Sequence, residues 1–168
     1  MDTRELEKLI KNVFRVGIVS SVNPAEMTAR VVFPDRDDLE GKDLQIGTDG
    51  AKDTRMYWVP HIGEQVLCAF CANDNNLTEG YILKSLYNAV DRPPASSASV
   101  RMILFDDGTI IKNDAGAVTI KATKSITINA PTVNITGNSG DVVVNGISLV
   151  NHTHGGVMPG GGSTGKPQ

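Results

Sequence analysis

Hydrophobic residues follow a helical spacing at the start of this 168-residue chain and a strand spacing through most of the rest. Leu6, Leu9, Ile10 and Val13 take the i, i+3, i+4, i+7 positions that line one face of a helix. This spacing predicts a short amphipathic helix over residues 2–13. A single helix of this length is marginal in water, so it needs a partner surface in its own domain or in a neighbouring subunit.

Residues 14–88 contain short alternating apolar runs that are separated by turn residues. The segment Asn23–Glu26 has turn chemistry and predicts a hairpin between the two runs that flank it. Five or six short strands in a stretch of this length suit a small closed antiparallel barrel, and the OB-fold is the commonest barrel of that size. The order of the strands and the closure of the barrel do not follow from periodicity alone.

Residues 89–99 combine Pro93 and Pro94 with small polar residues, which predicts a linker. From residue 100 to 150 apolar residues alternate in short bursts, and no aromatic residue follows Phe105. Strands this short bury too little apolar area to offset an ordering cost of about 1–2 kcal/mol per residue, and they expose edges. Both problems are solved if identical chains wrap around one axis, so we expect a mainly β protein with an intertwined β-prism shaft.

Composition and charge argue against some classes of function. A net charge of −3 and a pI near 5.6 argue against a nucleic-acid footprint, which usually needs a basic patch. The sequence has no run of about 18 apolar residues, so it predicts no membrane-spanning helix. The N-terminal residues lack the layout of a signal peptide. We therefore expect the chain to be made in the cytoplasm of the producing cell.

Two motifs typical of catalysis are missing from the sequence. It has no phosphate-binding loop and no His-Glu-x-x-His. We expect neither an enzyme nor a small-molecule substrate. Cys68 and Cys71 form a lone C-x-x-C pair, for which buried core thiols are favoured over metal or redox chemistry because no second pair is present.

His152 and His154 are the candidate metal ligands. They stand two residues apart at the close of the alternating tract, so in a strand both imidazoles point to the same face. Two histidines do not complete a metal site, but three chains around an axis bring six imidazoles together, enough for an octahedron. Six imidazoles by themselves would suit nickel or cobalt, whereas protein zinc sites are usually tetrahedral. The third histidine, His61, is expected to be an ordinary surface or packing residue.

Four blocks in order make the chain resemble the baseplate assembly protein V family, which forms the central spike of contractile phage tails and tail-like particles. The blocks are Phe14–Val19, Trp58–Val66, Phe105–Thr109 and His152–Gly156. The resemblance implies a homotrimer with an OB-fold collar, a triple-stranded β-helical shaft and an apex. In that family three His-x-His pairs bind one buried iron ion, so it implies that His152 and His154 are iron ligands here.

The resemblance also implies a function. Sheath contraction would drive the spike through the outer membrane of a target cell, and the baseplate hub and tail tube would be its partners in the virion or particle. We expect the N-terminal helix to contact that hub. The alternative reading is an OB-fold binding module, for single-stranded nucleic acid or glycan, on a trimeric β-stalk. The expected segments are helix 1–13, collar 14–88, linker 89–99, shaft 100–150 and apex 151–168.

Overall fold

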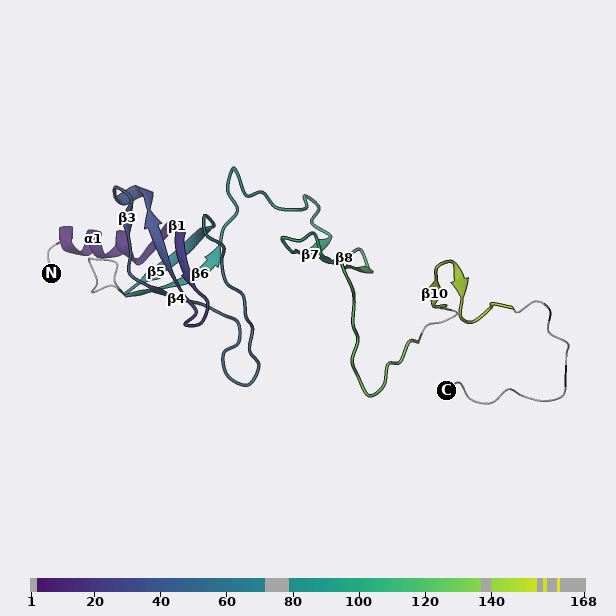
Figure 1. The fold of residues 1–168 in the computed structure, drawn as a ribbon. Helices are drawn as coiled ribbons and strands as arrows, with labels where there is room; N and C mark the ends of the chain where they lie inside the picture. The colour runs from purple at the N-terminus through teal and green to yellow at the C-terminus, as the bar shows by residue number, and fades with distance from the viewer. Residues whose placement is uncertain (1–2, 72–78, 137–139, 154–155, 157–159, 161–168) are drawn as a thin grey trace. The chain divides into compact units, whose positions relative to one another are not determined.

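The computed structural model describes residues 3–71, 79–136, 140–153, 156 and 160 (Figure 1). The chain divides into two units, Met1–Lys121 and Ala122–Gln168. Among the described residues, no helix combines the length and the apolar character that a membrane crossing requires.

The first unit begins with helix α1, Thr3–Val13, and α1 runs directly into the first strand. The apolar spacing predicted a helix over residues 2–13, and residue 2 lies outside the described part. The helix lies against strands β1 and β5. Leu6 and Ile10 are nevertheless 48% and 65% exposed, so the described residues leave part of the apolar face uncovered.

Five strands close into a small mixed barrel. The sheet order is β1-β5-β6-β4-β2, and β2 pairs with β1 to complete the ring. The short strand β3 pairs with Val32 and Phe33 at the end of β2. Every pairing is antiparallel except that of β4 with β6, which is parallel. The strands are β1 Phe14–Asn23, β2 Thr28–Phe33, β3 Leu39–Glu40, β4 Leu44–Ile46, β5 Gln65–Phe70 and β6 Gly80–Ser85, with a 3-10 turn at Pro34–Arg36.

Alternation of side chains builds the barrel core, because every second residue of a strand points inward. In β5, for example, Val66, Cys68 and Phe70 are buried while their neighbours are half-buried. The ring of Phe70 meets Phe33 edge-on, with centroids 5.6 Å apart and an interplanar angle of 71°. A mainly β fold with a small closed barrel is thus confirmed, but the prediction of a wholly antiparallel barrel is wrong, because β4 and β6 run parallel.

The two cysteines differ in burial. Cys68 is fully buried in the barrel core, and this burial raises the pKa of its thiol to about 12. Cys71 is half-buried, and neither cysteine forms a disulfide. The prediction of a buried core thiol is therefore confirmed for Cys68, while Cys71 lies nearer the surface.

A three-stranded antiparallel sheet completes the first unit. It consists of β7 Val100–Leu104, β8 Ile110–Asp114 and β9 Ala117–Lys121. The register places Ile103, Ile111 and Ile120 side by side in one row across the three strands. Directly paired residues share a face of the sheet, so these side chains form one apolar row.

The second unit has little secondary structure of its own. Residues 122–136 form no strand within the chain, although their apolar bursts predicted strands near 126–128 and 133–135. A short hairpin follows, formed by β10 Val143–Val144 and β11 Ile147–Ser148. The predicted shaft consists of strands from several chains, so its pairing stays a prediction.

Candidate metal centre at the apex hairpin

The hairpin of β10 and β11 carries the first candidate ligand. Its turn is Asn145–Gly146, with φ values of 49° and 82°. Positive φ at both central residues is the type I′ geometry that Asn-Gly favours and that matches the twist of the flanking strands. Val143 pairs with Ser148 and Val144 with Ile147, and the N–H of Leu149 donates to the carbonyl of Val142 at 2.9 Å. The hairpin therefore fixes the position at which the chain leaves β11.

Asp141 closes the open end of this hairpin. Its carboxylate accepts a hydrogen bond from the N–H of Val150 at 3.2 Å and another from the hydroxyl of Ser148. The bond from Ser148 is the main reason that the pKa of Asp141 lies below its ordinary value, and the N–H groups of Val150, Val142 and Leu149 add to it. The carboxylate thus connects the segment just before β10 to Ser148 of β11 and to Val150.

His152 is held by the backbone of the same hairpin. Its Nδ1 lies 2.8 Å from the carbonyl oxygen of Ser148. A carbonyl oxygen only accepts, so Nδ1 carries the hydrogen, and in the neutral ring the lone pair is then on Nε2. Metal-bound histidines are commonly fixed in this way, with one ring N–H donated to a backbone carbonyl and the other nitrogen bound to the metal. The geometry of His152 therefore fits a metal ligand that binds through Nε2.

The structure describes only one of the other two histidines. His154 lies outside the described residues, so its role as a ligand stays a prediction. His61 is an exposed turn residue whose N–H donates to Glu64 Oε2 at 2.7 Å, while its Nδ1 lies 3.9 Å from the same oxygen. This confirms His61 as an ordinary surface histidine. Within the part of the chain that the structure describes, no three His, Cys, Asp or Glu residues are grouped to hold a metal ion.

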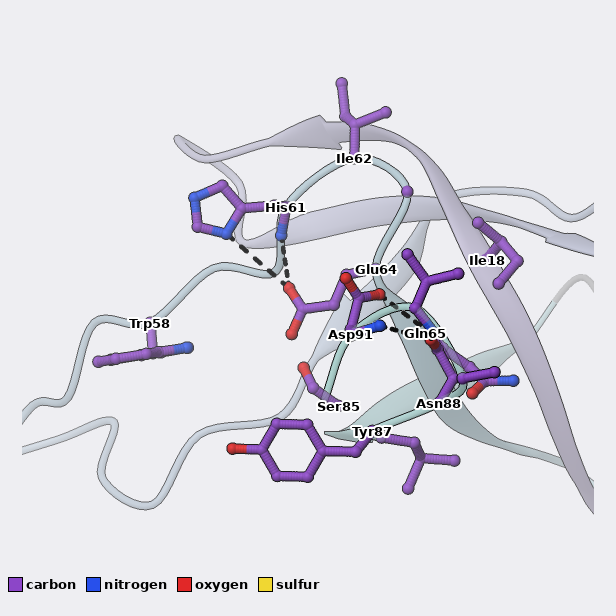
Figure 2. Close-up of a pocket in the computed structure, with 14 residues that line it drawn as sticks. Ile18, Trp58, His61, Ile62, Glu64, Gln65, Ser85, Tyr87, Asn88 and Asp91 are labelled. Carbon is purple, nitrogen blue, oxygen red and sulfur yellow. Dashed lines mark hydrogen bonds and ion pairs between the residues drawn. The ribbon is translucent and has the colours of Figure 1, made fainter. Parts of the chain in front are cut away.

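A concave region lies beside the barrel. It is an open hollow of about 1030 Å³ between the segment around Trp58–Gln65 and the segment Ser85–Asp91 (Figure 2). Trp58 and Tyr87 are 57% and 66% exposed there. The 14 described residues that line the hollow include the acidic Glu64 and Asp91 but no lysine or arginine. Negative groups without cations do not suit a phosphate backbone, whose binding depends on Lys and Arg.

Trp58 also connects two parts of the first unit. Its ring lies 6.2 Å from the ring of Phe105, centroid to centroid, at an interplanar angle of 42°. Phe105 follows directly after β7, and Trp58 belongs to the loop between β4 and β5. Two of the blocks that carried the resemblance, Trp58–Val66 and Phe105–Thr109, are therefore in contact through these rings.

Comparison with known proteins first identifies the class of the apex. Residues 146–168 match the GpV Apex motif. The match begins inside the turn of the hairpin and includes β11, His152 and His154. The segment that sequence reasoning selected as a metal-binding tip is thus a recognised apex segment.

Most of the chain is also similar to a particular spike. It is 28% identical over 129 residues to the spike protein of Escherichia phage P2, which makes it a distant homologue of that protein. The aligned region covers 76% of this chain and 59% of the phage P2 protein, so the chain spans less than two thirds of its relative's length. Both comparisons confirm the resemblance to phage spikes, and they relate the chain to a structural spike protein and not to an enzyme.

Proposed function

We propose that this chain is one subunit of a homotrimeric central spike, located at the baseplate tip of a contractile phage tail or tail-like particle. The single observation that carries the proposal is the apex motif over residues 146–168, at the end of a chain that is similar to a phage spike protein. Sheath contraction drives the spike through the outer membrane of the target cell, and the protein acts mechanically.

The sheet of β7, β8 and β9 supports the trimer, because an apolar row on one of its faces is exposed. The row Ile103, Ile111 and Ile120 is 42%, 43% and 55% exposed. Lys112 lies on the opposite face, where its Nζ is 3.4 Å from Asp114 Oδ2. Fully burying one isoleucine side chain stabilises a structure by about 1.5–3 kcal/mol. Three identical chains around an axis would bury this row, and one chain alone leaves it in water.

The first part of the second unit supports an intertwined shaft. Ile126, Ile128, Val133 and Ile135 are each more than half exposed, and residues 122–136 make no strand within the chain. Their backbone N–H and C=O groups therefore have no ladder partners from the described part of the same chain. Pairing with neighbouring chains would give them partners and turn the apolar side chains toward the axis.

The apex supplies the metal centre of the trimer. His152 and His154 of three chains provide six imidazoles for one iron ion, in the octahedral arrangement that the resemblance implies. Bound iron would hold the three strand ends together, where small residues such as Gly155 and Gly156 leave little apolar volume for packing. The orientation of His152, with Nδ1 on the Ser148 carbonyl, supports binding through Nε2.

The barrel acts as the collar that attaches the spike to the baseplate hub. Its closed five-strand order and its single parallel pairing, β4 with β6, support an OB-type barrel. Leu6 and Ile10 stand four residues apart on α1 and are both exposed, so they form a short apolar stripe on the helix, and Phe14 at the start of β1 is exposed as well. This stripe supports α1 as the contact with the hub or tail tube.

Two measurements on the same sample test the proposal. Light scattering on the full chain without a histidine tag should give the mass of a trimer, and metal analysis should give one iron ion per three chains. A stable monomer would refute the shaft, and a trimer with an ordered but metal-free tip would refute the ligand assignment.

The hollow beside Trp58 and Tyr87 is the one observation that favours the alternative, a binding module on a trimeric stalk. Exposed aromatic rings are typical of surfaces on which bases or sugars stack. The carboxylates of Glu64 and Asp91, without a lysine or arginine in the lining, disfavour nucleic acid. Titration of a labelled single-stranded oligonucleotide should show no binding at physiological salt, and saturable binding at this hollow would revive the alternative.

A further inference from the structure

We infer that Asp141 and Ser148 are positioning residues that set the orientation and the tautomer of His152 before any metal binds. This inference rests on the proposed metal centre and adds to it the residues that prepare one ligand in each chain. Asp141 lies outside the apex motif, which begins at residue 146, so the motif alone does not single it out.

The first step is the closure of the hairpin. The carboxylate of Asp141 accepts from the N–H of Val150, nine residues further along the chain, and from the hydroxyl of Ser148. The Asn145–Gly146 turn closes the other end. The loop is thus fixed at both ends, and the residue that leaves it, Asn151, starts from a defined position.

The second step runs through Ser148, which takes part in three contacts. Its hydroxyl donates to Asp141 and accepts from the N–H of Asn151 at 2.7 Å. Its carbonyl accepts from Nδ1 of His152 at 2.8 Å. The carboxylate of Asp141 is therefore linked to the imidazole of His152 through Ser148 and has no direct part in the contact with Nδ1.

The consequence for binding is preorganisation. A histidine that is free in solution samples several rotamers and both neutral tautomers, and a metal must select the productive one. The contact with the Ser148 carbonyl selects Nδ1–H and presents Nε2. Because a trimer repeats the arrangement three times, any loss of order at His152 affects three of the six proposed ligands together.

The test compares three variants in the full, untagged chain. D141A removes the carboxylate, D141N keeps an acceptor oxygen at the same place and serves as the matched control, and S148A removes the hydroxyl but keeps the carbonyl. H152A assigns the ring signals of His152. Light scattering on every variant checks that assembly is unchanged.

The first readout needs no metal. In metal-free wild-type protein, the ¹⁵N shifts of the His152 ring should show hydrogen on Nδ1. We expect D141A to shift the ring to a mixture of tautomers, S148A to have an intermediate effect and D141N to stay with the wild type. A wild-type tautomer in D141A would overturn the positioning role.

The second readout is the loss of Fe²⁺ to a chelator. Changes to residues that orient a metal ligand typically cost about 10–100-fold in metal affinity, so D141A should lose Fe²⁺ at least about tenfold faster than D141N. Equal rates in trimers of equal mass would contradict the inference. A wild-type protein that binds no Fe²⁺ would instead refute the proposed metal centre, and the tautomer comparison would still decide the role of Asp141.

Discussion

The barrel and the second unit use the same kinds of apolar residue in opposite ways. Every fully buried hydrophobic side chain among the described residues lies between Val19 and Ile82, inside the barrel. In the second unit, the described valines and isoleucines are exposed over more than half of their surface, from Val144 at 52% to Ile135 at 73%, apart from the half-buried Val142. The barrel builds its own core, whereas the apolar residues of the second unit need surfaces from outside the chain. The comparison therefore separates what one chain stabilises from what the proposed trimer stabilises.

A charged residue in the exposed apolar row should have the largest effect, because it should disrupt the trimer and leave the barrel folded. I111D places a carboxylate in the middle of the row Ile103, Ile111 and Ile120, which the trimer would bury. An unpaired buried charge is strongly unfavourable, so we expect light scattering to report monomers while the barrel stays folded. K112A, on the opposite face of β8, is the matched control and should remain trimeric. Trimers of I111D would show that the row faces solvent in the assembly.

A cavity in the barrel should have the reverse effect. Phe33 is fully buried and meets Phe70 edge-on. F33A should lower the free energy of unfolding of the barrel by about 3–5 kcal/mol, as truncation of a buried phenylalanine usually does. Urea unfolding followed by the fluorescence of Trp58, the single tryptophan, would measure it. L39A, at a 42% exposed position of β3, should cost far less, and equal losses would mean that the core is not where the structure has it.

Removal of both predicted ligands should affect the metal alone. The double variant H152A/H154A should contain no iron and still assemble, because the proposed interface along the shaft is far larger than the apex. Metal analysis and light scattering on the same sample measure both. A monomeric double variant would show that the metal, and not the apolar row, holds the chains together.

The barrel could be predicted from the sequence to a certain level of detail. Alternation around Val66, Cys68 and Phe70 indicates strands with one buried face, and turn residues mark their ends. The parallel pairing of β4 with β6 could not be predicted, because alternation records which face of a strand is buried and not which strand lies beside it. The same limit applies to the contact between Trp58 and Phe105, which depends on the path of two loops.

The apex shows a different limit. The spacing of His152 and His154 pointed to a metal site because residue types and periodicity carry that signal. Asp141 and Ser148 were not singled out, since their roles depend on the register of a two-residue hairpin. Asn145–Gly146 between apolar residues was the available signal, because Asn-Gly is the strongest short-range mark of such a turn. The strands predicted within 122–136 do not form in one chain, as their proposed partners belong to other chains.

Truncation of Trp58 should give a moderate effect that connects the two regions. W58A removes the ring contact with Phe105, and aromatic pairs contribute about 0.5–1.5 kcal/mol beyond the area they bury. We expect faster amide exchange in β7, next to Phe105, with little change in the barrel. F105L, which keeps apolar volume but loses the ring, should behave in the same way. Unchanged exchange in both variants would show that this contact does not order β7.

Acid should produce the smallest change, and only at the apex. Hydrogen bonds hold the pKa of Asp141 below its ordinary value of 3.8, so its ionised form favours the ordered hairpin. The contribution is present above the unfolded pKa and is lost as the pH falls through the lower folded one. A ¹³C titration of the Asp141 carboxyl in metal-free protein should therefore show a midpoint below 3.8, with loss of the protection of the Val150 amide at the same pH. A midpoint for Asp141 at or above 3.8 would mean that its carboxylate does not close the hairpin.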